Sequence, residues 1–277
     1  MSTEPTREEA AIAWWRTSII DIHPGRIEVR GYPIEELIGR ITFPDMIWLM
    51  LRGELPSAAQ GRLLEAALVA SVDHGPQAPG IAIARMSITC GIGINSAMAS
   101  GVNALGDVHG GAGQQCMELY AAIAAREDGG ASPPEAAAAE VAERLQKRNP
   151  IPGFGHRFHP IDPRAGRLLA LVEAARVKGA VSGRFAGIGR AVEDALAAAK
   201  KKRLPMNIDG ATAVVFAELG FPPALGRGLF VLSRSVGILA HAWEQSCQGG
   251  RIKGPMPPSI PYTFEGPAVR HLEESGR

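Results

Sequence analysis

Hydrophobic residues recur at helical spacing along most of the chain, in segments separated by glycine and proline. From Ser18 to Tyr32, hydrophobic and polar residues instead alternate on both sides of Pro24 and Gly25, which predicts a short β-hairpin. Helices are predicted over residues 34–38, 44–52, 58–71, 81–105, 114–126, 135–147, 165–177, 181–202, 211–219 and 225–245. Segment 81–105 is one central helix or a pair, and its glycines and alanines would let two backbones approach closely. The pattern therefore predicts an all-α fold with a short N-terminal β-hairpin.

Composition narrows the class of protein. A chain of 277 residues can bury a large core, in one domain or in two. The net charge of +1 and the 21% of charged residues exclude an obvious nucleic-acid or anionic-membrane partner. The three cysteines lack CxxC spacing, and no hydrophobic run approaches the roughly 20 residues that span a bilayer. The N-terminal residues are polar, with no hydrophobic segment after them. We therefore expect a cytoplasmic globular protein.

Residues 150–164 are the most distinctive stretch, because they hold two histidines, two arginines and an aspartate among four prolines and two glycines. Gly153 and Gly155 predict a tight turn just before His156. The prolines exclude a continuous helix, and a new helix is predicted just after Arg164. His156 and Arg164 are thus predicted on a rigid loop at the mouth of a helix, where ligand-binding groups are common.

Three histidines share one local design. His74, His109 and His156 each lie beside glycine in a loop at a helix end. One such histidine is more often structural than functional, but three with the same setting favour a function. A metal-binding scaffold is one alternative, since imidazole is a common transition-metal ligand. The set lacks HxxxH or HxH spacing and has no companion carboxylate nearby in sequence, so we predict no metal site.

A carboxylate and arginines accompany these histidines. Asp209 is either the N-cap of the following helix or a general base whose pKa burial raises. Arg164 and Arg234 are candidate carboxylate clamps, and Arg234 lies in a hydrophobic run where it needs an anionic partner from protein or ligand. The basic run at 200–203 is either a solvated helix end or an attractor of phosphates. GxSxG, GxGxxG and Walker motifs are absent. This combination indicates proton transfer next to a carbonyl group on a polycarboxylate substrate.

Seven segments, in order, resemble motifs of the citrate synthase superfamily. They read RGYPIEEL at 30–37, GELP at 53–56, DHG at 73–75, HGGA at 109–112, GFGHR with DPR between 153 and 164, NIDG at 207–210, and SRSVGILAH at 233–241. Each is weak evidence alone, but the ordered set covers most of the chain. The resemblance implies a two-domain helical fold with an active site between the domains.

The resemblance also implies a role for each matching residue. Asp209 would remove a proton from the acetyl-CoA methyl group, His109 would stabilise the enol, and His156 would polarise the oxaloacetate carbonyl. The carboxylates of the substrate would bind His74, Arg164 and Arg234. The weaker candidates for binding coenzyme A are Arg157, Lys202 and Arg203. No bound cofactor is implied, because the CoA thioester is a substrate.

The chain departs from the synthase pattern in three places. Only 17 residues run from Ser57 to Asp73, where synthases insert further helices. The loop after His74 is rich in proline and glycine, as in citryl-CoA lyases and the citryl-CoA-cleaving module of ATP-citrate lyase, whereas His109 is a synthase feature. Gly254 falls near the place of the arginine that synthases contribute across the dimer. Arg251 or Lys253 would substitute for it.

These observations lead to a specific prediction. We expect a citryl-CoA lyase, which cleaves citryl-CoA to acetyl-CoA and oxaloacetate, or alternatively a compact citrate or 2-methylcitrate synthase. The protein would be a homodimer with a large domain of residues 1–112 and 215–277 and a small domain of residues 113–214. A citryl-CoA synthetase is a candidate partner. A different alternative is a non-catalytic subunit that acts only together with an acyl-CoA ligase.

Overall fold

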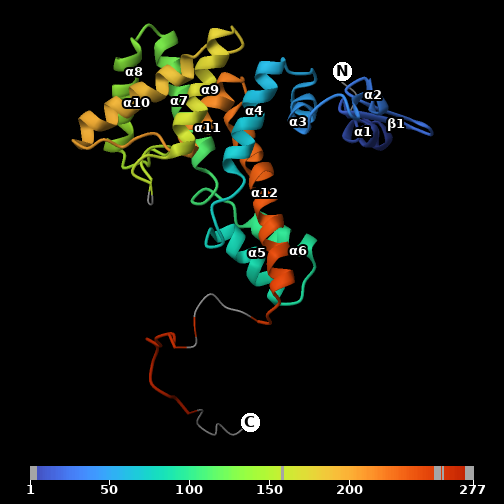
Figure 1. The fold of residues 1–277 in the computed structure, drawn as a ribbon, viewed down its shortest axis with the longest axis vertical. Coiled ribbons are helices and arrows are strands. Elements are labelled where there is room, and N and C mark those ends of the chain that lie inside the picture. Colours follow the sequence, from blue (N-terminus) through green and yellow to red (C-terminus); the bar gives the residue numbers. More distant parts are fainter. Residues whose placement is uncertain (1–4, 157–158, 253–256, 258, 272–277) are drawn as a thin grey trace.

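A computed structural model describes residues 5–156, 159–252, 257 and 259–271. The described chain is mostly helical, with one small antiparallel sheet, which confirms the predicted fold class (Figure 1). The strands are β1 (Ile20–His23), β2 (Arg26–Val29) and β3 (Tyr32–Pro33). The helices are α1 (Arg7–Trp14), α2 (Ile34–Leu37), α3 (Phe43–Arg52), α4 (Ala58–Ser71), α5 (Pro79–Thr89), α6 (Ile94–Asn103), α7 (Ala112–Asp128), α8 (Pro133–Gln146), α9 (Pro163–Val177), α10 (Arg184–Lys200), α11 (Ile208–Glu218) and α12 (Pro223–Gln248).

Helix ends follow local capping chemistry. The Ser57 side chain accepts a hydrogen bond from the backbone of Gln60, whose own side chain accepts from the backbone of Ser57, so α4 begins where the sequence predicts. Gly53 adopts a left-handed conformation and ends α3. The segment 81–105 forms two helices, α5 and α6. The predicted close approach is confirmed, because a Cβ on Gly101 would lie 2.6 Å from the carbonyl oxygen of Gly80.

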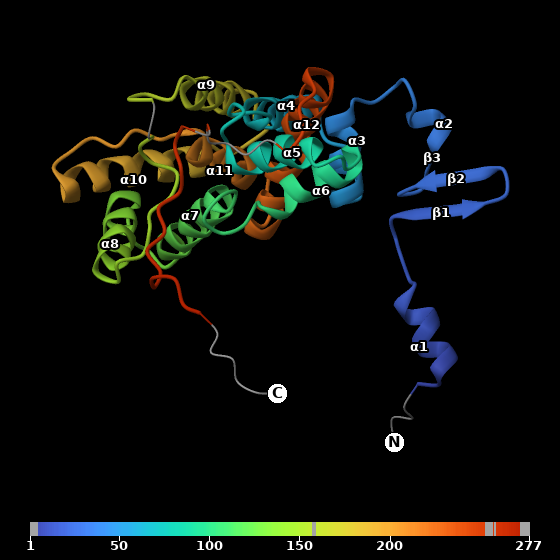
Figure 2. The same ribbon diagram turned by 90° about the horizontal axis from the view of Figure 1, so that it is seen from below.

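The N-terminal part forms a separate layer of structure. Ile20 pairs with Val29 in the predicted hairpin, and β3 adds a third strand. A small hydrophobic cluster around Val29, Leu37 and Leu49 joins this sheet to α3. In Figure 2 the sheet and α1 lie to one side of the main helices. Helix α1 buries no residue and was not predicted, although Thr6 and Glu9 form a capping box at its start.

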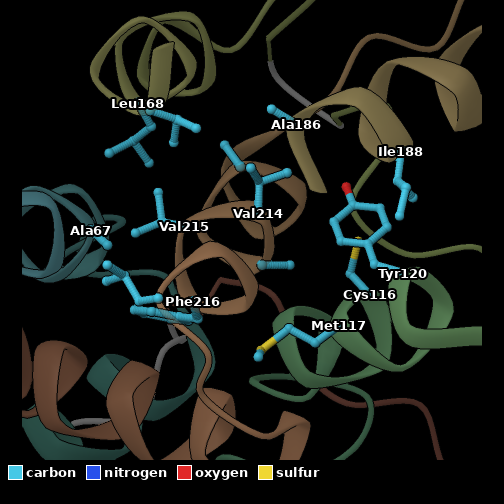
Figure 3. Packing of buried hydrophobic residues seen from close by; sticks show 14 of the residues in the cluster. Ala67, Cys116, Met117, Tyr120, Leu168, Ala186, Ile188, Val214, Val215 and Phe216 are labelled. Carbon is cyan, nitrogen blue, oxygen red and sulfur yellow. The ribbon is translucent and has the colours of Figure 1, made fainter. Parts of the chain in front are cut away.

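Helix α11 occupies the centre of the main core. Its residues 210–216 are all buried, so it is hydrophobic on every side. Figure 3 shows Val214, Val215 and Phe216 surrounded by side chains from α4, α7, α9 and α10. This packing holds the start of α11, where Asp209 lies, in a rigid position.

The hydrophobic clusters bear on the predicted domains. The main cluster joins helices of the segment 113–214 to residues of α3, α4 and the first part of α12. A second cluster joins α5 and α6 to the last part of α12. The main cluster contains residues on both sides of the predicted boundaries at 112/113 and 214/215. The division into two domains stays a prediction. None of the described helices is both long enough and apolar enough to cross a membrane.

Candidate active site

One cavity of about 200 Å³ brings the predicted catalytic residues together. Its walls come from the end of α4, from loops after α4, α6 and α8, and from α9, α11 and α12. Six of its lining residues were predicted as site residues: His74, His109, His156, Arg164, Asp209 and Arg234. Segments far apart in sequence therefore converge here.

Asp209 lies in the first turn of α11, but it is not the cap. The Asn207 side chain caps the helix by accepting hydrogen bonds from the backbone N–H groups of Asp209 and Gly210, at 2.9 and 3.2 Å. The carboxylate of Asp209 is left to line the cavity. Burial raises the pKa of Asp209, although Arg164, Arg234 and His156 act to lower it. A carboxylate with a raised pKa is a stronger base, so the general-base alternative fits the geometry.

The loop that carries His156 is tied directly to the start of α11. The backbone of Asn207 donates to the carbonyl of Gly153 at 2.9 Å, and its side chain donates to the carbonyl of Gly155 at 2.6 Å. Gly153 has φ +90°, and a Cβ there would lie 2.9 Å from Cα of Gly210. Only glycine permits this approach. The distance between His156 and Asp209 therefore depends on the hydrogen bonds from Asn207 to this loop and on the close approach of Gly153 to Gly210.

A hydrogen bond to Nδ1 defines the tautomer of a neutral His156 ring. Its Nδ1 accepts a hydrogen bond from the backbone N–H of His159 at 3.1 Å, so a neutral ring carries its proton on Nε2. Burial lowers the pKa of His156, and the neighbouring His159 lowers it further. The ring is consequently a neutral hydrogen-bond donor, as needed to polarise a carbonyl group.

The His74 ring lies beside the His156 ring in the cavity lining, in an edge-to-face arrangement with centroids 5.4 Å apart. The preceding Asp73 accepts from the backbone N–H of Gly75 at 3.2 Å and pairs with His241 of α12 at 3.3 Å. Burial lowers the pKa of His74, and the charge of Arg164 lowers it further. A neutral His74 can donate a hydrogen bond to an anionic ligand.

His109 has an unpaired ring nitrogen. Its Nε2 is buried and has no hydrogen-bond partner among the residues that the structure describes. The loop is closed by a bond from the backbone N–H of Gly106 to the carbonyl of His109, at 2.8 Å. Burial lowers the pKa of His109, and Arg234 lowers it further. A buried, unsatisfied nitrogen at a cavity wall is destabilising unless a ligand pairs with it.

Arg164 is held by a buried carboxylate. Its Nε and Nη2 each donate to Asp162 at 2.9 Å, and the same carboxylate accepts from the backbone N–H of Ile208 at 3.0 Å. Burial acts to raise the pKa of Asp162, but the hydrogen bonds from Arg164 outweigh it and the pKa is lowered. Asp162 thus joins the start of α9 to the start of α11. Asp162 belongs to the DPR motif, but the sequence alone indicates no role for it.

Arg234 is 6% exposed in the middle of α12. Its Nε donates to the carbonyl of Ser71 at 3.1 Å, and its guanidinium carbon lies 4.9 Å from the centre of the Phe230 ring. No carboxylate within the described ranges forms an ion pair with it. Among these residues the expected anionic partner is missing, which favours a ligand carboxylate.

Three histidines lie close enough to be considered as metal ligands. Each of His74, His156 and His159 has a ring nitrogen within 4.8 Å of those of the other two. However, Nδ1 of His156 already accepts a hydrogen bond, and Arg164 and Arg234 place positive charge beside the cluster. These features suit an anion better than a cation. That no metal is needed stays a prediction.

The other predicted residues that the structure describes lie outside this cavity. Lys202 and Arg203 are exposed beyond the end of α10, and Arg203 pairs with Glu193. Arg251 follows α12 next to Ile252, whose backbone bonds to Thr89 at the end of α5. The role of Arg251 across a dimer interface stays a prediction. Arg157, Lys253 and Gly254 lie outside the described residues.

Similarity to known proteins agrees with these motifs. The family model described as "Citrate synthase, C-terminal domain" matches residues 7–62 and 59–256. The structure of citryl-CoA lyase from Hydrogenobacter thermophilus superposes with a TM-score of 0.83 at 32% identity, covering 94% of this chain and 97% of that one. An ATP citrate lyase from Methanosaeta concilii, at 22% identity and TM-score 0.73, shares the fold over 95% of this chain and 45% of its own.

Curated relatives are longer. Citrate synthase of Haloferax volcanii is 30% identical over 198 residues, which cover 71% of this chain and 49% of that protein. ATP-citrate synthase subunit 1 of Sordaria macrospora is 30% identical over 234 residues, which cover 78% of this chain and 33% of that protein. The chain therefore spans half or less of the length of these relatives.

Proposed function

The chain belongs to the citrate synthase family, and on that premise we propose that it is a citryl-CoA lyase, which cleaves citryl-CoA to acetyl-CoA and oxaloacetate by a reversible Claisen-type step. The observation that carries the proposal is one cavity in which a partly buried carboxylate, three histidines and two arginines meet. These groups are the ones that proton transfer and carboxylate binding at a carbonyl centre require.

The chemistry is simplest in the direction of condensation. Asp209, whose pKa burial raises, takes a proton from the methyl group of acetyl-CoA. His109, whose Nε2 has no hydrogen-bond partner among the described residues, would stabilise the enolate oxygen, and Nε2–H of His156 would polarise the ketone of oxaloacetate. A preorganised donor at a developing oxyanion contributes about 3–4 kcal/mol of barrier lowering. In cleavage, the hydroxyl proton passes to solvent while Nε2–H of His156 donates to the forming ketone oxygen. The carbon–carbon bond breaks, its electron pair becomes the enolate beside His109, and protonated Asp209 gives its proton to that carbon.

The substrate carboxylates would bind the cationic side of the cavity. Arg234 is buried without a carboxylate partner within the described part of the chain, so we assign it a substrate carboxylate. His74 and Arg164 complete the set, and Arg251 would serve the cavity of a second copy. Exposed hydrophobic side chains on α12, among them Val236 and Trp243, support a homodimer. Lys202 and Arg203, with Arg157, are assigned to the phosphates of coenzyme A.

Two observations favour the lyase over a synthase. The 14-residue helix α4 passes directly into the His74 loop, without room for further helices. The citryl-CoA lyase structure also superposes on 94% of this chain with a TM-score of 0.83 at 32% identity. The alternative is a compact citrate or 2-methylcitrate synthase, which the presence of His109 and the names of several relatives favour.

The test offers purified protein synthetic citryl-CoA in one reaction and acetyl-CoA with oxaloacetate in another. Release of oxaloacetate from citryl-CoA without free CoA would support the lyase. Free CoA with citrate from either mixture would identify a synthase that also hydrolyses the thioester. No reaction in either mixture, with protein that is folded, would refute both and favour a subunit that depends on a partner.

A further inference from the structure

One face of α12 contacts the end of α4 and the residues that lead into the His74 loop. Ser233 donates to the carbonyl of Leu68 at 2.5 Å, and Arg234 donates to the carbonyl of Ser71. Four residues after Ser233, a Cβ on Gly237 would lie 2.2 Å from the carbonyl oxygen of Val72. These α12 residues lie on one face of the helix because they are separated by about one turn.

His241 makes the last contact in this series. Its Nε2 lies 3.3 Å from the carboxylate of Asp73, the residue just before His74. Its Nδ1 lies 3.3 Å from Nη1 of Arg85 on α5. An arginine can only donate, so Nδ1 of His241 accepts, and Nε2 carries the proton that is donated to Asp73. Arg85 is itself held by hydrogen bonds to Glu244 and Gln248.

The carboxylate of Asp73 connects His241 to the backbone of the His74 loop. It accepts from the backbone N–H of Gly75, so the two residues that flank His74 are joined across it. Gly75 has φ +86°, a conformation that turns the chain sharply after His74. The imidazole of His74 is thereby directed toward His156 and the cavity.

We infer that His241 is a positioning residue, which through Asp73 holds His74 in place to bind a carboxylate of the substrate. His241 does not line the cavity, so it acts only through the loop. The predicted effect of His241 on the reaction rests on the proposed function, whereas its effect on the conformation of the His74 loop does not. His241→Ala removes the donor, and His241→Gln restores an N–H at the position of Nε2. Gln245→Ala is the matched control, because Gln245 lies one turn further along α12 and bonds only to Gly249 among the described residues.

Steady-state kinetics with varied oxaloacetate and varied acetyl-CoA is the first measurement. His241→Ala should raise KM for oxaloacetate about threefold to tenfold, the loss of one net hydrogen bond, and leave KM for acetyl-CoA unchanged. His241→Gln should recover most of the loss. In a double-mutant cycle, His241→Ala should add nothing further to the KM of a His74→Ala variant. Equal increases in both KM values, or full additivity with His74→Ala, would overturn the inference.

Hydrogen exchange of the unliganded protein is the second measurement, and it needs no activity. His241→Ala should speed exchange in peptides covering residues 72–76 at least threefold, while His241→Gln and Gln245→Ala leave these peptides unchanged. If exchange there is unchanged in His241→Ala, the inference is wrong even if the enzyme is a lyase. If exchange rises but neither substrate reacts, the positioning stands and the proposed function fails.

Discussion

Replacing Asp162 with asparagine tests whether one buried carboxylate joins the two helices that carry the site. Asp162 is 2% exposed, and it accepts from the side chain of Arg164 twice and from the backbone of Ile208. Asp162 is also the N-cap of α9, since it accepts from the backbone N–H of Arg164 at 3.1 Å. Asparagine keeps the size of the side chain and is an equally good N-cap. It removes the charge and replaces one acceptor oxygen with an NH2 donor, which leaves Arg164 without its ion-pair partner and two neighbouring N–H groups without an acceptor.

The expected loss of stability is large for a substitution that exchanges one oxygen for an NH2 group. Breaking a buried ion pair by removing one partner costs about 3–5 kcal/mol, and the side chain of Arg164 is 22% exposed, so about 2–4 kcal/mol is expected. The lowered pKa of Asp162 means that this stabilisation is present above the unfolded-state pKa and is lost as pH falls through the folded-state pKa. The difference in free energy of unfolding between wild type and variant should therefore be largest near neutral pH and should become smaller below about pH 4.

Urea unfolding followed by circular dichroism, at pH 7 and at a pH below 4, measures this difference. The control is Glu173→Gln on the same helix, because Glu173 forms a similar two-bond pair with Arg176 in which both side chains are 48% exposed. The control should not change the midpoint of unfolding measurably. A loss at pH 7 no larger than that of the control, or a difference that does not narrow in acid, would refute this reasoning.

Three further substitutions have defined outcomes. Asn207→Ala should lower stability by about 1–2 kcal/mol and reduce kcat, because it removes the cap of α11 and the bond to the His156 loop; an unchanged kcat would contradict this. Gly237→Ala should lower the melting temperature, since its Cβ would meet the carbonyl oxygen of Val72 at 2.2 Å, whereas Gly228→Ala on the same helix has open space and should not; equal melting temperatures would contradict this. Arg234→Lys should raise KM for oxaloacetate roughly tenfold or more, through loss of the two-pronged donor; an unchanged KM would contradict it.

Much of the fold could be predicted because helix ends are encoded locally. Ser57 and Gly53 mark the ends of α4 and α3 through side-chain capping and a left-handed turn, both visible in the sequence. Helix α1 was missed because it buries nothing and so has no hydrophobic periodicity. Strand β3 has only two residues, too few for an alternating pattern.

The site was harder to predict than the fold. Composition and spacing identified His74, His156 and Asp209 as candidates but could not decide whether Asp209 capped its helix. The structure decides this, since Asn207 two residues earlier is the cap. The role of Asp162 depends on a contact with Ile208, 46 residues away, and no local pattern reports such a contact. The role of each catalytic residue came from family resemblance, and it stays a proposal.

The measurement that most directly tests the account is exchange of the acetyl-CoA methyl protons in deuterated water, followed by proton NMR. The central claim is that Asp209 is the base at the carbon that forms and breaks the bond. Wild-type protein with an oxaloacetate analogue should exchange these protons, and Asp209→Asn should slow exchange at least ~100-fold, the usual contribution of a positioned general base. Exchange at the wild-type rate in Asp209→Asn would contradict the claim.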